Sequence, residues 1–94
     1  MQASEMIKGK YYHIMQGSSP WIIIFSHMEE DSIFTFHFLQ DNWFKKQPVS
    51  SEWGTENLID SIREASLEEI QHLDACIQAG KYVKAPQSIK YEIY

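Results

Sequence analysis

Hydrophobic positions in the first half of the chain fall into three segments that are rich in aromatic and β-branched side chains: residues 10–16, 21–26 and 33–39. In the third segment Phe34, Phe36 and Phe38 alternate with other residues at a period of two. Turn-forming residues separate the segments, with Gly17 to Pro20 after the first and the polar run 29–32 before the third. Such segments bounded by turns predict a three-stranded antiparallel meander. Beyond it, residues 40–54 predict loops around a short strand that carries Trp43 and Phe44.

The pattern changes to a helical period later in the chain. Ser66, followed three residues later by Glu69, forms a capping box, which is typical of a helix start. Gly80 offers the left-handed residue that ends many helices, so we predict a helix over residues 67–79. Its apolar side chains recur at spacings of three and four and form one stripe: Leu67, Ile70, Leu73 and Ile77.

Two segments are harder to assign. Leu58, Ile59 and Ile62 fit one face of a helix, which favours a helix over residues 56–62, but residues 62–65 equally fit a strand that leads into the helix cap. At the end of the chain, residues 89–94 alternate again and predict a last strand.

These elements predict an α+β fold with an antiparallel sheet of about four or five strands, open or curled into a small barrel, and one main C-terminal helix. The 94 residues, 44% of them hydrophobic, suit one domain with one core. Within that single domain, residues 8–54 form the sheet, residues 55–80 form an acidic connector and the helix, and residues 81–94 form a tail strand.

Charge narrows the set of partners. Thirteen acidic and eight basic side chains give a net charge of −5, which disfavours direct binding to nucleic acid through phosphate contacts. Most of the acid lies between residues 51 and 75. If that region is helical, four carboxylates recur every fourth residue: Glu56, Asp60, Glu64 and Glu68. Such a stripe is typical either of a solvated face or of a surface that docks on a basic partner protein.

The two faces of the meander suggest a second candidate site. With tight turns, one face would form the core and carry Tyr12, Ile14, Ile22, Ile24, Phe34, Phe36 and Phe38. The opposite face would mix aromatic and hydrogen-bonding side chains, which suits the stacking of a small (cyclic) nucleotide: Tyr11, His13, Trp21, Phe25, Thr35 and His37. The alternative is that terminal strands or barrel closure cover this second face.

Little in the sequence indicates catalysis. The single cysteine, Cys76, excludes an internal disulfide, and the four histidines lack metal-ligand spacing, so we expect no metal and no cofactor. Cys76 and His72 lie four residues apart on the predicted helix, so they could touch, and a Cys–His contact is the minimum for thiolate chemistry. No other catalytic motif appears, and we expect a non-enzyme.

The longest apolar run, residues 21–25, is too short to cross a membrane, and no secretory signal opens the chain; both indicate a cytoplasmic protein.

Several short motifs carry a resemblance. The segment Arg63-Glu64-Ala65-Ser66-Leu67-Glu68-Glu69, with Ala79-Gly80-Lys81 after it, resembles the Arg-x-Ala-Thr-x-Glu-Glu helix start of small uncharacterised proteins of phages and mobile elements of gut anaerobes. Lys8-Gly9-Lys10-Tyr11-Tyr12 and Trp53-Gly54 are similar to further segments of these proteins. After Lys81 the chain departs from that pattern, because Tyr82-Val83-Lys84 replaces a tryptophan-containing end.

The resemblance implies a genomic setting, without catalytic residues. We therefore predict a non-catalytic binding protein of phage or prophage-like origin, in the host cytoplasm, which sequesters or blocks a host protein, for example as a counter-defence inhibitor. Two alternatives remain: a sponge for a small cyclic nucleotide, and a purely structural globular protein. A homodimer is left open.

Overall fold

The computed structural model describes residues 1–40, 42–47 and 49–85. In these residues the predicted α+β class is confirmed, with an antiparallel sheet and one C-terminal helix. The elements in chain order are η1 (Ala3–Glu5), β1 (Tyr11–Gln16), β2 (Ser19–Glu29), β3 (Ser32–Gln40), β4 (Trp43–Lys45), β5 (Ser51–Thr55), η2 (Glu56–Leu58), β6 (Ser61–Glu64) and α1 (Leu67–Ala79).

Strands β1, β2 and β3 form the predicted meander. Two-residue turns join them, at residues 17–18 and 30–31. The first residue of each turn has a left-handed backbone, with φ of 64° at Gly17 and 56° at Glu30. Glycine adopts this conformation without steric cost, whereas a residue with a Cβ loses about 1–2 kcal/mol there. The second turn therefore holds a locally strained glutamate.

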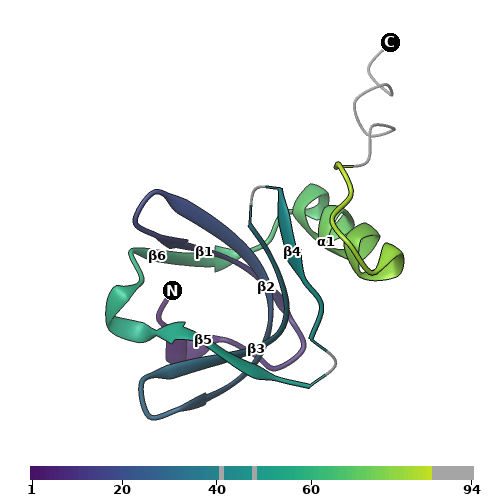
Figure 1. Ribbon diagram of the computed structural model, residues 1–94. Helices are drawn as coiled ribbons and strands as arrows, with labels where there is room; N and C mark the ends of the chain where they lie inside the picture. Colours follow the sequence, from purple (N-terminus) through teal and green to yellow (C-terminus); the bar gives the residue numbers. More distant parts are fainter. Residues whose placement is uncertain (41, 48, 86–94) are drawn as a thin grey trace.

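Short strands complete both edges of the sheet. The outer side of β3 pairs with β4 near one end and with β5 near the other, while β6 pairs with β1 at the opposite edge. The strand order is β4-β3-β2-β1-β6, with β5 beside β3. The described strands β5 and β6 do not pair with each other, so the sheet is curved but not closed into a barrel (Figure 1).

The connector between β5 and the helix corrects the sequence prediction. Residues 56–62 are not a helix: η2 makes one short turn, and β6 then pairs along β1. The helical reading needs Leu58 and Ile62 on one buried face, yet Leu58 is 55% exposed and Ile62 is buried. Pairing with β1 satisfies the backbone of residues 61–64, and this confirms the alternative of a strand leading into the helix cap.

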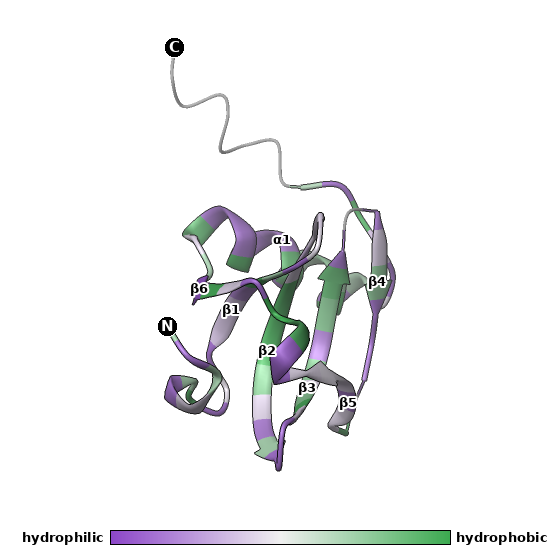
Figure 2. Ribbon diagram, turned by 90° about the vertical axis from the view of Figure 1, so that its left-hand side faces the viewer, coloured by the Kyte–Doolittle hydropathy of each residue, from purple (hydrophilic) through white to green (hydrophobic). Residues whose placement is uncertain are grey.

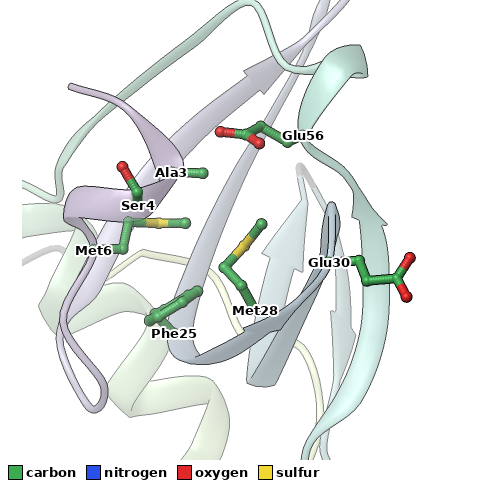
Figure 3. A pocket seen from close by; sticks show the side chains of 7 residues that line it. All are labelled: Ala3, Ser4, Met6, Phe25, Met28, Glu30 and Glu56. Atoms are coloured by element: carbon green, nitrogen blue, oxygen red, sulfur yellow. The ribbon is translucent and has the colours of Figure 1, made fainter.

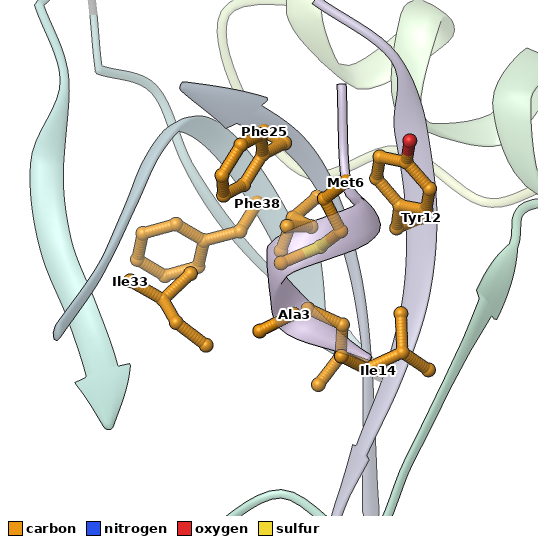
Figure 4. Close-up of a cluster of buried hydrophobic side chains, with 9 residues drawn as sticks. Ala3, Met6, Tyr12, Ile14, Phe25, Ile33 and Phe38 are labelled. Atoms are coloured by element: carbon orange, nitrogen blue, oxygen red, sulfur yellow. The ribbon is translucent and has the colours of Figure 1, made fainter. Parts of the chain in front are cut away.

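The sheet buries side chains on both faces, and the hydropathy colours of Figure 2 show hydrophobic stretches along β2 and β3. The N-terminal segment lies inside the curve, and α1 packs on the outside. We call the inner cluster the concave core (Figure 4); its buried members are Ala3, Met6, Tyr12, Ile14, Ile23, Phe25, Ile33, Phe38 and Ile62. We call the outer cluster the convex core; its buried members are Ile22, Leu39, Leu73 and Cys76.

The predicted assignment of strand faces is wrong for β2 and part of β3. Tyr12 pairs with Ile23, so Ile23 joins the concave core while Ile22 and Ile24 face the helix. The two-residue turn shifts the register by one residue from the predicted one, and a one-residue shift exchanges the faces. Irregular pairing between β2 and β3 changes the alternation again, so that Ile33 and Phe38 are both buried in the concave core.

Helix α1 begins and ends at the predicted residues. Ser66 and Glu69 form the reciprocal capping box, and Gly80 ends the helix with φ of 73°. Its buried contacts come from Leu73 and Cys76, whereas Leu67, which was predicted to belong to the apolar stripe, is 68% exposed.

The residues after the helix return along it. Tyr82 and Val83 pack against the convex core, and the Val83 carbonyl accepts a hydrogen bond from His72 Nε2 at 2.7 Å. Residues 81–85 form no strand, and the predicted strand over 89–94 lies outside the described residues.

Candidate functional site

A cavity of about 360 Å³ opens on the concave side of the sheet (Figure 3). Three segments that are far apart in the sequence meet around it: η1 with Met6, the end of β2 with the turn that follows, and η2. Its lining residues are Ala3, Ser4, Met6, Phe25, Met28, Glu30 and Glu56. Methionine side chains are flexible and polarisable, so they adapt to apolar groups of different shape. The lining therefore combines adaptable apolar side chains with three polar residues, Ser4, Glu30 and Glu56.

The two rim carboxylates differ in direction. In Figure 3 the Glu56 carboxylate extends over the cavity toward the N-terminal segment, whereas the Glu30 carboxylate points away from the other lining side chains. Glu56 makes no ion pair with the rest of the chain where the structure describes it. Its charge is therefore available to a ligand that enters the cavity.

Backbone hydrogen bonds hold Glu56 in this place. The Glu56 N–H donates to the Asp31 carbonyl in the β2–β3 turn at 2.7 Å. Four residues later, Asp60 accepts from Gly17 N–H at 2.8 Å and donates its own N–H to the Met15 carbonyl at 2.8 Å. The segment 56–60 is thus fixed to both hairpin turns of the meander, which places the Glu56 side chain at the cavity mouth.

The predicted ligand residues do not share one face. The three on the concave side are Trp21, Phe25 and Thr35, and the three on the convex side are Tyr11, His13 and His37. Phe25 lines the cavity, and Thr35 is fully buried beside it in the sheet, with a hydroxyl that has no hydrogen-bond partner in the described part of the chain. The predicted stacking surface is therefore split between the two sides of the sheet.

Trp21 belongs to an aromatic cluster at the other end of β2. Its ring lies 4.8 Å from Phe38, 5.1 Å from Trp53 and 5.8 Å from Trp43, centroid to centroid. All three tryptophans of the chain therefore meet there. Trp43 is 46% exposed, while Trp21 and Trp53 pack against the concave core. Trp43 is therefore the tryptophan of this cluster that is most accessible to a partner.

His37 anchors a loop. Its Nδ1 accepts a hydrogen bond from Gln47 N–H at 2.9 Å, and the Gln47 side-chain amide donates to the carbonyls of Thr35 and Phe36. Burial, followed by the charge of Lys46, lowers the pKa of His37. The lowered pKa favours the neutral ring, which the hydrogen bond from Gln47 requires.

The predicted acidic stripe is dispersed over four elements. Glu56 is in η2, Asp60 is in the following loop, Glu64 is in β6 and Glu68 is in α1. Asp60 holds the first turn, and Glu64 pairs with Lys10 at 3.2 Å. All four residues are exposed, but they do not form one helical face, because residues 56–64 are not helical.

A second hollow, of about 220 Å³, lies on the convex side between α1 and the sheet. We call it the convex groove; it is lined by His13, Pro20, Ile22, Leu39, Glu69 and His72. Glu69 is 25% exposed and accepts from Arg63 through both oxygens, at 3.0 and 2.9 Å. Burial acts to raise the pKa of Glu69, but hydrogen bonds from Arg63 and the Ser66 N–H, with the charges of Arg63 and His13, hold it below its ordinary value.

This lowered pKa predicts an acid-sensitive helix start. A carboxyl group with a depressed pKa in the folded state adds stability above its unfolded pKa, about 4.3, and this stability is lost as the pH falls through the folded pKa. We expect Glu69→Gln, which keeps the capping box, to lower the free energy of unfolding by about 0.5–1 kcal/mol at pH 7, since Arg63 is half exposed. The difference should vanish at a pH where Glu69 is protonated in both the folded and the unfolded protein. Urea unfolding of both proteins at several pH values measures this; a constant difference down to pH 2 would contradict it.

The fold raises the pKa of two further groups, the Tyr11 hydroxyl and the Cys76 thiol. Burial, the hydrogen bond to Asp74 and the charge of Asp74 raise the pKa of Tyr11 to about 12, so its hydroxyl stays a donor that ties β1 to α1. Burial raises the pKa of the Cys76 thiol, although the Val83 N–H acts in the opposite sense. Cys76 and His72 both bond to Val83 rather than to each other. This geometry does not support the thiolate chemistry that the sequence left as a remote option.

Sequence reasoning missed most of the cavity. Ala3, Met6 and Met28 carry no motif, and only their convergence in the fold makes them a site. Glu30 was assigned to a hairpin tip, and its positive φ is visible only in the structure. Two predicted site residues do line the cavity, Phe25 from the predicted stacking face and Glu56 from the predicted acidic stripe.

Comparisons with protein-family models, with curated proteins and with solved structures gave no match. No helix in the described ranges is long and apolar enough to cross a membrane. Across residues 1–40, 42–47 and 49–85, no three His, Cys, Asp or Glu side chains group as metal ligands. The case for a function therefore rests on the two hollows themselves.

Proposed function

We propose that this chain is a small non-catalytic binding protein, and that the concave cavity takes up a basic side chain of a partner protein. One observation carries the proposal: the Glu56 carboxylate, which has no ion pair in the described part of the chain, extends over the mouth of a cavity lined by Met6, Phe25 and Met28. A lysine or arginine side chain that lies across the cavity mouth places its aliphatic stem on Met6 and Met28 and its cationic end beside Glu56. Phe25 adds apolar surface at the base of the cavity.

Rigidity of the site supports the same proposal. The Glu56 backbone is bonded to the β2–β3 turn, and that turn keeps Glu30 in a left-handed conformation that a glycine would adopt at lower cost. Strained backbone persists where the surrounding structure fixes it, and such positions cluster at binding sites. A preformed cavity reduces the ordering cost of binding.

The biological setting extends this proposal. The resemblance of residues 63–69 to phage and mobile-element proteins suggests that the partner is a host protein, which the chain would block by occupying a basic segment of it. The net charge of −5 supports a basic partner, because complementary charge speeds association.

The test uses hexylguanidinium as a probe for the basic side chain, with hexanoate and hexanol as controls of the same length. We expect calorimetry to show that the guanidinium compound binds and that both controls bind at least several-fold more weakly. Glu56→Gln should weaken binding about fivefold, since a partly exposed charge pair contributes about 1 kcal/mol. Glu30→Gln makes the same change of charge at the same rim and should alter binding less than about twofold.

Two results would overturn the proposal. The first is equal binding of hexanoate, which would show that Glu56 does not select a cation. The second is an equal effect of the two glutamine variants, which would show that overall charge, and not the Glu56 position, governs affinity.

A further inference from the structure

The convex groove has a floor that the sheet register builds in one row. Arg63 pairs with His13, His13 with Ile22, Ile22 with Leu39, and Leu39 with Phe44. Directly opposite residues of neighbouring strands lie on the same face, about 4.5–5.5 Å apart. The row therefore runs across five strands from a polar end to an apolar end, and Ile22 and Leu39, which are 8% and 3% exposed, form the apolar base of the groove beside His13.

Two imidazole rings supply the free hydrogen-bonding groups. His72 donates from Nε2 to the Val83 carbonyl, so its Nδ1 is an acceptor when the ring is neutral. His13 has no hydrogen-bond partner in the described part of the chain. The groove thus offers one acceptor of fixed tautomer and one ring that can donate or accept.

The remaining polar group does not suit an anion. Glu69 lines the groove, and its oxygens are occupied by Arg63 and by the Ser66 N–H. Arg63 is in turn balanced by Glu69, so the groove has no excess positive charge to hold a phosphate. A neutral ligand avoids repulsion from this carboxylate.

The volume of the groove limits the ligand to one ring system. About 220 Å³ lies below the roughly 300–1,000 Å³ of sites for drug-sized molecules. From the apolar base, the two imidazole rings that line the groove and this size, we propose that the convex groove binds one neutral nucleobase-like heterocycle. Its ring enters the groove over Ile22 and Leu39, and its edge hydrogen-bonds to His13 and His72. A sugar or phosphate attached to the base would remain outside.

This site is independent of the concave cavity, since it lies on the other side of the sheet. The test is titration with adenosine, guanosine, cytidine and uridine, followed by ligand-observed NMR, with ribose 5-phosphate as the probe for the sugar-phosphate alone. We expect at least one nucleoside to bind with a Kd below about 1 mM and ribose 5-phosphate not to bind. Glu56→Gln should leave this binding unchanged, which separates the result from that of the proposed function.

A matched pair of variants locates the site. His13→Phe keeps a ring of similar size in the half-buried row but removes its hydrogen bonds, and we expect about tenfold weaker binding. His27→Phe is the control, because His27 stacks on Phe34, 4.7 Å between centroids, away from the groove. No binding by any nucleoside, equal binding of ribose 5-phosphate, or wild-type affinity of His13→Phe would each overturn the proposal.

Discussion

Trp21→Ala is expected to destabilise the protein by about 3–5 kcal/mol. Trp21 is the centre of the aromatic cluster, in contact with Phe38, Trp43 and Trp53, and it packs against the concave core. Truncating a large aromatic side chain removes its buried area and leaves a cavity, and each aromatic pair adds about 0.5–1.5 kcal/mol. The free energy of unfolding of a small domain is only about 5–15 kcal/mol, so this variant should be close to unfolding at 37 °C.

Trp43→Ala is the matched control for this result. Trp43 belongs to the same cluster but is 46% exposed and lies on the short strand β4. We expect Trp43→Ala to lower the free energy of unfolding by about 1 kcal/mol. Urea unfolding followed by far-ultraviolet circular dichroism measures both variants without relying on tryptophan emission. Equal losses would contradict the central position of Trp21.

The second large effect is expected at the helix. Leu73 is fully buried between α1 and the sheet, and Leu73→Ala should cost about 2–5 kcal/mol. Leu67→Ala in the same helix is the control, because Leu67 is 68% exposed and its loss should stay within about 0.5 kcal/mol. Chemical denaturation of both variants tests this, and a comparable loss in the two would show that helix propensity, and not docking, dominates.

Local signals predicted the local elements well. The capping box and Gly80 mark both ends of α1 in the sequence, because each motif satisfies the unpaired backbone groups of a helix end with nearby residues. The meander was predicted for a similar reason, since turns and alternation both act over a few residues. The alternation of Phe34, Phe36 and Phe38 was a weaker guide, as only Phe38 belongs to the concave core.

Features that depend on distant segments were not predictable. The run 21–25 is apolar throughout, so it does not indicate which residues face the helix, and the turn length decides this. The residues around 62 fit a helix and a strand equally well, and pairing with the edge of β1 decides for strand β6. The concave cavity is assembled by η1, β2 and η2 together, which explains why each predicted set of site residues contributes only one member to it, Phe25 and Glu56.

The central claim is that the concave cavity binds a basic, partly apolar side chain. The most direct measurement is a spectrum of the protein labelled with ¹³C at the methionine methyl groups, recorded during titration with hexylguanidinium. Met6 and Met28 line the cavity, whereas Met15 on β1 does not. The account predicts that the Met6 and Met28 signals shift with saturation while the Met15 signal stays in place, and that hexanoate has no such effect. Unchanged Met6 and Met28 signals, or an equal shift at Met15, would contradict it.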